Sequence, residues 1–151
     1  MSERNPIRIY AVHGWSQDED YMRLFEYLES ADKFYYRALS NPEARSPGGD
    51  GVAARRTVIN EALKDAECVV CCAGTWERFN DWARFTVETA RGLDLPVIAV
   101  EHFGPKDMDV RLKGHAAEVV GWDSRSIVDA IRREARHEET TRFDTIEFKL
   151  D

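Results

Sequence analysis

Residues 7–24 read IRIYAVHGWSQDEDYMRL and contain the pattern that decides the fold. A short apolar, β-branched run over residues 7–12 stops at His13 and passes within a few residues into an acidic segment with helical spacing, which predicts a buried strand, a turn and a helix. Ser16 and Glu19 have the spacing of a capping box, so we expect the helix to begin just after Ser16. Ligands of open α/β sheets bind outside the carboxyl ends of the strands, and the turn at residues 13–16 is therefore the first candidate site.

The composition fits one domain of ordinary size. The chain has 151 residues, of which 43% are hydrophobic and 32% charged. We assign residues 1–136 to this domain and treat residues 137–151 as a charged C-terminal extension. Within that extension, the alternation of residues 145–150 (TIEFKL) suits a solvent-facing edge strand or a partner-binding tail.

The charge pattern excludes several partners. The net charge is −7 and the pI about 5.2, and the Lys and Arg residues are scattered, whereas binding to nucleic acid or to an anionic membrane needs clustered positive charge. No apolar run approaches the roughly 18 residues of a membrane span. The first six residues, MSERNP, lack the basic-then-apolar pattern of a signal peptide. We therefore expect a cytoplasmic protein with neither nucleic-acid nor membrane partners.

The three cysteines, Cys68, Cys71 and Cys72, lie in one apolar run, CVVCCA. Side chains alternate in direction along a strand, so Cys68 and Cys71 point to opposite faces and cannot form a disulfide. We interpret all three as small core hydrophobes.

Strand and helix patterns alternate along the rest of the chain. The first helix ends near Ser30, and residues 40–51, with two prolines and three glycines, form a loop. Residues 74–78 lead out of the third strand, and Asn80 is a plausible N-cap. Further strands are predicted at 34–39, 67–73, 95–100 and 118–121, and further helices from 52, over 81–91 and after the cap at 122–124.

This alternation predicts an α/β fold of the flavodoxin-like class, a three-layer sandwich around a five-stranded parallel sheet of order 2-1-3-4-5. The switch point of such a sheet lies between its first and third strands. We therefore expect residues 13–16 to lie beside residues 74–78 and to frame one hollow with aromatic walls.

The usual ligands of this fold leave few alternatives. The turn at residues 13–16 is too bulky to cradle a phosphate, and the acidic pair of a phosphoacceptor is missing. His13 and His102 both follow strands, but no third metal ligand at fixed spacing accompanies them, so we expect no metal. The remaining candidates are aromatic. Trp15, Trp76 and Trp122 follow predicted strand ends, and Trp82 lies in the first turn of the helix after the third strand. Their faces either stack on a nicotinamide or adenine ring or close the top of the core.

The ordered set of these residues resembles the bacterial TIR-like domains of the Thoeris ThsB type. The similarity starts with IYAVHGW at residues 9–15 and Asp20-Tyr21-x-Arg23-Leu24, and it continues in 69–76 (VVCCAGTW), Trp82, 96–98 (PVI) and 121–132 (GWDSRSIVDAIR). The resemblance implies a TIR-like fold, self-association and a role in anti-phage immunity. In that family, such domains cleave the nicotinamide–ribose bond of NAD and make a cyclic ADP-ribose-type messenger.

The resemblance also implies which residues bind a ligand. NAD or a related nucleotide would be substrate or ligand, with no tightly bound cofactor, and other TIR-like subunits or a defence-system protein would be partners. The expected ligand-binding residues are His13, Gly14, Trp15, Gly74, Trp76, Trp82 and Thr86.

One position departs from the family pattern. Active members carry the catalytic glutamate four residues after the tryptophan of the third helix, and here Trp82 is followed at that spacing by Thr86. A hydroxyl cannot stabilise the positive charge of an oxocarbenium-like transition state as a carboxylate does. Glu88 is about 200° around the helix from Thr86 and should face away. Glu77 and Glu101, just past strand ends, are better placed substitutes, although each can equally be a solvated surface acid.

Two hypotheses follow. The chain is either an NAD-processing enzyme, a glycohydrolase or cyclase, with a relocated or dispensable acid, or a catalytically silent TIR-like module that binds a nucleotide or another TIR domain. Thr86 favours the silent module, whereas the environment of His13, Trp15 and Trp82 favours at least ligand binding.

Overall fold

The computed structural model, in which residues 1–44 and 49–138 are described, contains a five-stranded parallel sheet of order β2-β1-β3-β4-β5. The strands are β1 (Ile7–Ala11), β2 (Tyr36–Ala38), β3 (Cys68–Cys72), β4 (Val97–Val100) and β5 (Glu118–Val120). The predicted flavodoxin-like fold and strand order are confirmed. Each of the five predicted strands of the sheet is present but shorter at one or both ends than the sequence pattern indicates, with β2 reduced to three residues.

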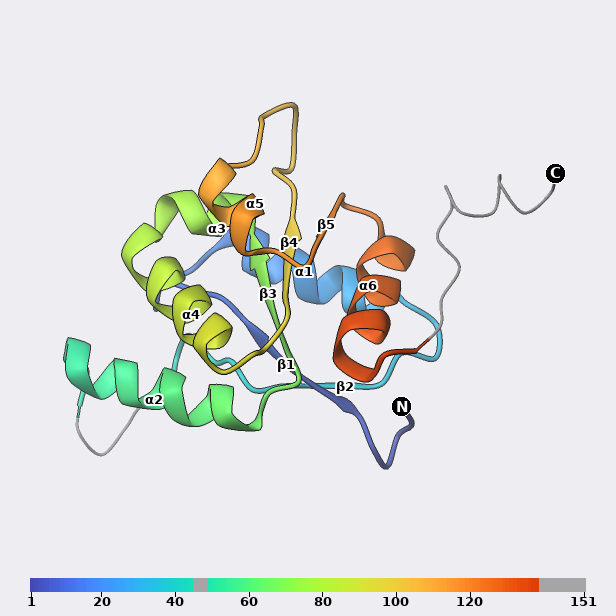
Figure 1. Ribbon diagram of the computed structural model, residues 1–151, viewed down its shortest axis with the longest axis horizontal. Coiled ribbons are helices and arrows are strands. Elements are labelled where there is room, and N and C mark those ends of the chain that lie inside the picture. Colours follow the sequence, from blue (N-terminus) through green and yellow to red (C-terminus); the bar gives the residue numbers. More distant parts are fainter. Residues whose placement is uncertain (45–48, 139–151) are drawn as a thin grey trace, which may run out of the picture.

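The sheet is covered on both faces (Figure 1). Helices α1 (Glu19–Glu29) and α6 (Ser124–Arg136) pack on one face, and α2 (Val52–Asp65), α4 (Asn80–Gly92) and α5 (Val110–His115) pack on the other. Consecutive residues of β3 alternate between the two cores: Cys71 belongs to the α2/α4/α5 side, and Cys68 and Cys72 to the α1/α6 side. All three cysteines are buried and free, as predicted, and burial raises the pKa of each thiol.

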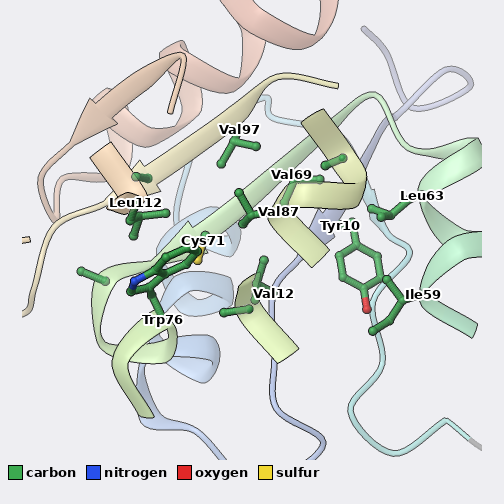
Figure 2. Packing of buried hydrophobic residues seen from close by; sticks show 14 of the residues in the cluster. Tyr10, Val12, Ile59, Leu63, Val69, Cys71, Trp76, Val87, Val97 and Leu112 are labelled. Carbon is green, nitrogen blue, oxygen red and sulfur yellow. The ribbon is translucent and has the colours of Figure 1, made fainter. Parts of the chain in front are cut away.

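Figure 2 shows the core on the α2/α4/α5 side. Tyr10 and Val12 from the end of β1 and Val69 and Cys71 from β3 meet Ile59 and Leu63 of α2, Val87 of α4 and Leu112 of α5. Trp76 lies among these side chains and is only 1% exposed. Large apolar side chains thus fill this layer up to the carboxyl edge of the sheet.

Two helix starts differ from the prediction. Helix α1 is capped by Asp18, whose side chain accepts a hydrogen bond from the Asp20 N–H at 3.1 Å, so the predicted capping box at Ser16 is wrong by two residues. Residues 74–78, predicted as a connection, belong to the short helix α3 (Ala73–Arg78), which also takes in Ala73, predicted as the end of the strand. Asn80 is the first residue of α4 rather than its cap, and its amide donates to the Trp76 carbonyl at 3.1 Å.

The last helix is as predicted, because Asp123 caps α6 through the Ser126 N–H at 2.8 Å. The predicted strand at residues 145–150 lies outside the described residues. No helix in the described ranges is long and apolar enough to cross a lipid bilayer.

Gly14 is a point at which the carboxyl edge tolerates little change. A Cβ at this position would lie 2.1 Å from Cγ of Phe79, so Gly14→Ala must displace a packed ring. We expect a loss of about 1–3 kcal/mol in the free energy of unfolding, measured by urea denaturation. At Gly121 a Cβ would meet nothing closer than Glu101 Oε2 at 3.7 Å, so Gly121→Ala is the control. Equal effects of the two substitutions would contradict this packing.

Candidate functional site

The turn after β1 holds Trp15 in a left-handed backbone conformation. Its φ is 64°, a value that costs energy for a bulky residue and occurs often at functional sites. The Trp15 N–H donates to Nδ1 of His13 at 3.2 Å, and the two rings meet edge to face at 4.6 Å. The imidazole therefore fixes the turn from inside.

His13 is a buried, neutral group. Because Nδ1 accepts the Trp15 N–H, the ring proton belongs on Nε2, which lies 3.2 Å from the Tyr10 hydroxyl. Burial, and then the positive charge of Arg55, lower the pKa of His13 from 6.5 to about 4. The histidine is thus a positioning residue for the turn and carries no charge at neutral pH.

An ion-pair network joins the start of α1 to α3. The buried Asp18 carboxylate accepts hydrogen bonds from the Thr75 hydroxyl and from the Arg78 guanidinium, which also bonds Asp20 at 2.7 Å. Asp20 in turn pairs with Arg23 at 2.7 Å. Burial opposes the charge of Arg78, but its hydrogen bonds with Asp20 and Asp18 raise its pKa.

The turns at His13 and Gly74 are joined by this packing. A Cβ on Gly14 would strike the Phe79 ring, and a Cβ on Gly74 would lie 2.0 Å from Asp20 Oδ2. The space beside the two glycines is therefore filled with packed side chains, and a hollow of about 460 Å³ that Asp18, Asp20 and Arg78 line is not lined by residues 13–16. The described residues thus do not form the one hollow expected between the two turns, because spacing along the chain does not reveal which side chains pack onto the two glycines.

The large cavity lies one strand further along the sheet, between α1 and β2. It is an open groove of about 1060 Å³. We call it the α1–β2 groove. It is lined by Trp15 and residues 16–18 of the turn; Tyr21, Met22, Phe25, Glu26 and Glu29 of α1; Ala38 of β2; Ser40, Asn41, Pro42 and Glu43; and Arg55 of α2.

Ser40 fixes the chain beside this groove. Its hydroxyl accepts the Ala11 N–H at 3.2 Å and lies 2.9 Å from the Tyr21 hydroxyl. Ser40 is only 7% exposed, so β1, α1 and the segment after β2 meet at one buried hydroxyl. The groove is thus preformed on this side, as binding sites for small molecules usually are.

Aromatic and cationic side chains converge at Trp15. The Arg55 guanidinium lies over the Trp15 ring at 5.1 Å, and the Trp82 ring meets Trp15 edge to face at 6.0 Å. Trp82 itself lines a separate hollow of about 460 Å³ between α2 and α4, beside Arg56 and Phe85. Trp15 is thus the only one of the seven expected ligand-binding residues that lines the α1–β2 groove.

Thr86 and the two expected substitute acids lie away from the groove. Thr86 is 1% exposed, and its hydroxyl donates to the Trp82 carbonyl at 2.8 Å within α4. Glu77 pairs with Lys106 and His102, both at 2.6 Å, and the Lys106 bond lowers its pKa. Glu101 is exposed beyond β4, where its backbone carbonyl accepts the Trp122 indole N–H at 2.7 Å. None of the three lines the α1–β2 groove.

The histidines are likewise separate. His13 bonds within the β1 turn and His102 bonds Glu77, so the two serve different networks. In residues 1–44 and 49–138, no group of three His, Cys, Asp or Glu side chains could hold a metal ion.

The sequence of α1 contains a feature that could have identified the groove residues that the sequence analysis missed. Tyr21 and Phe25 share an apolar stripe with Leu24 and Leu28, and the stripe predicts burial of all four. Only Leu24 and Leu28 are fully buried, while Tyr21 and Phe25 remain half exposed. The acidic neighbours Glu26 and Glu29 are the sign that this flank of α1 faces solvent rather than core.

The pKa of His13 makes stability depend on pH. The unfolded chain takes up a proton near pH 6.5 and the folded chain only near pH 4, so the free energy of unfolding falls as pH drops through this window. The His13 contribution is complete above pH 6.5, and about 3 kcal/mol is lost by pH 4. His13→Gln should remove this part of the pH dependence. An NMR titration midpoint of the wild-type His13 ring at pH 6 or above would contradict the assignment.

Asp18 is expected to contribute more to stability than an exposed ion pair. Its side chain is 1% exposed and that of Arg78 is 49% exposed. Asp18→Asn removes the buried negative charge and leaves one acceptor oxygen where the Thr75 hydroxyl and the Arg78 guanidinium now use two. We expect a loss of about 2–3 kcal/mol in the free energy of unfolding. The exposed Glu61–Lys64 pair is the control, and Glu61→Gln should cost less than about 0.5 kcal/mol. Equal losses for both variants would argue against the network.

Comparisons with known proteins give a likeness in structure only. No family model matches the chain, and no curated protein matches it in sequence. Among solved structures, it is similar to the crystal structure of a 3-dehydroquinate dehydratase-like protein from Bifidobacterium longum, with a TM-score of 0.45 and 14% identity over 93% of this chain and 100% of that one. That likeness is too distant to carry function to this protein.

Proposed function

We propose that this protein is a TIR-like signalling module of the Thoeris ThsB type that binds an NAD-type nucleotide in the α1–β2 groove. The family assignment and the NAD ligand come from the sequence resemblance, and the groove supplies a site of suitable size and chemistry. One observation carries the proposal: the groove combines the flat aromatic faces of Trp15, Tyr21 and Phe25 with the Arg55 cation.

Each part of the groove suits a part of such a ligand. Aromatic side chains stack on nicotinamide and adenine rings, and a guanidinium binds phosphate oxygens with two parallel hydrogen bonds. The carboxylates of Glu26, Glu29 and Glu43 make the rest of the groove acidic, which suits the positive charge of an oxidised nicotinamide ring. A volume of about 1060 Å³ is at the upper end for small-molecule sites.

In this proposal the protein binds its nucleotide without cleaving it. Thr86 is buried and bonded to the Trp82 carbonyl, so α4 directs no acid toward the groove. Binding would instead control assembly with other TIR-like subunits, as a homo-oligomer, or with a defence-system partner in anti-phage immunity.

A second function, NAD cleavage to a cyclic ADP-ribose-type messenger, is favoured by one observation. The groove has carboxylates of its own, and Glu26 on α1 is exposed beside the aromatic side chains. Incubating concentrated protein with NAD and measuring nicotinamide distinguishes the two functions. Nicotinamide release that Glu26→Gln abolishes would replace the silent module with the enzyme.

Binding is tested with two adjacent arginines. Arg55 lines the groove and lies over Trp15, whereas Arg56 lines the hollow between α2 and α4 and lies over Phe85 at 5.0 Å. We expect isothermal titration calorimetry with NAD to show binding that Arg55→Ala weakens about tenfold, the loss of a charged hydrogen bond to phosphate. Arg56→Ala removes the same charge outside the groove and is the control, so it should leave the affinity for NAD unchanged.

Two results would contradict the binding site. One is the absence of any heat of binding when NAD is titrated into the wild-type chain. The other is an equal loss of affinity in the Arg55 and Arg56 variants, which would place the phosphates elsewhere or show a general effect of charge.

A further inference from the structure

Charge is distributed unevenly along the α1–β2 groove. Of the described residues that line it, only Arg55 is positively charged, and its guanidinium lies over the Trp15 ring at 5.1 Å, beside the turn that leads into α1. Glu26 and Glu29 line the groove from the second half of α1, roughly 10 and 15 Å along the helix axis from its first residue, and Glu43 adds a third carboxylate. The groove therefore has a cationic end at Arg55 and an acidic end at Glu26 and Glu29.

Aromatic side chains connect the two ends. The His13 ring lies 5.9 Å from the Tyr21 ring, and the Tyr21 ring lies 4.9 Å from the Phe25 ring. Phe25 in turn lies 6.0 Å from the Tyr36 ring, whose hydroxyl donates to Glu29 Oε1 at 2.8 Å. Tyr21 and Phe25 line the groove, so a ligand stacked on them would extend from the cationic end toward the acidic end.

The charges at both ends are available to a ligand. In the part of the chain that the structure describes, the Arg55 guanidinium donates to no acceptor, and the Glu26 carboxylate has no hydrogen bond or ion pair. Glu29 accepts one hydroxyl hydrogen bond but pairs with no described cation. Both glutamates are exposed. The Asp18 carboxylate, which also lines the groove, is instead paired with Arg78.

We propose that the α1–β2 groove distinguishes oxidised from reduced dinucleotides, so that the module responds to the ratio of NAD to NADH. This inference rests on the proposed function and adds an orientation to it. The phosphates bind Arg55 at the cationic end, and the nicotinamide ring lies near Glu26 and Glu29 at the acidic end.

The phosphates do not contribute to this preference. Both forms of the dinucleotide carry the same two phosphates, so their attraction to Arg55 is the same. Only the oxidised nicotinamide ring is positively charged, and only this ring is attracted by Glu26 and Glu29. Because both carboxylates are exposed, water and salt weaken the attraction, and we expect a preference of about fivefold to tenfold for NAD over NADH.

The preference is tested by isothermal titration calorimetry with NAD and with NADH at low salt. Glu26→Gln keeps the size of the side chain and removes its charge, so it should weaken NAD binding about fivefold without weakening NADH binding. Arg55→Ala should weaken the binding of both forms by the same factor, because it acts on the phosphates that they share.

Glu19→Gln is the matched control. It removes an equal charge from the same helix, but Glu19 is exposed beside the hollow that Arg78 lines and does not line the groove. Both affinities should stay unchanged in this variant. Raising the salt to about 1 M, where charges are screened beyond about 3 Å, should remove most of the preference of the wild-type chain.

Several results would overturn the inference. Equal affinities of the wild-type chain for NAD and NADH would do so and would leave nucleotide binding itself intact. Equal effects of Glu26→Gln and Glu19→Gln would show a general effect of the charge on α1. A preference that persists in Glu26→Gln and at high salt would come from stacking rather than from charge. The absence of heat with either dinucleotide would overturn the proposed function as well.

Discussion

The closure of the carboxyl edge between β1 and β3 determines where this protein can hold a ligand. Phe79 packs against Gly14, and the Arg78 guanidinium joins Asp18 and Asp20 across the same boundary. Flavodoxin-like sheets usually bind ligands at this switch point. Here the protein's own side chains fill the space beside Gly14 and Gly74, and the α1–β2 groove lies at the neighbouring boundary between β1 and β2.

The same closure explains why α1 has two roles. Its first turn is fixed to α3 by the buried Asp18 carboxylate, while Leu24 and Leu28 are packed in the core. Because these contacts hold α1 in place, Tyr21 and Phe25 can remain partly exposed toward β2. The wall of the groove is thus rigid, which lowers the entropic cost of binding anything that enters it.

The strand order was predictable from the sequence because it depends on periodicity, and periodicity survives small errors in strand ends. The apolar run CVVCCA identifies β3 as a central strand whichever residue begins it. The site was less predictable, because it depends on contacts between distant residues. Nothing near Gly74 in the sequence shows that Asp20 fills the space beside it. Helix α3 was missed for a local reason, since no side chain caps its start.

Thr86 fits its surroundings better than a glutamate would. Its hydroxyl bonds the Trp82 carbonyl one turn back, so a nearly inaccessible side chain has no unsatisfied polar group. A carboxylate buried to the same degree would lose its hydration, at a cost of several kcal/mol or a raised pKa unless a cation lay against it. The packing of α4 therefore favours a helix that supports Trp82 and Trp15 over one that presents an acid, and any chemistry in the groove would have to come from the carboxylates of α1 and the segment after β2.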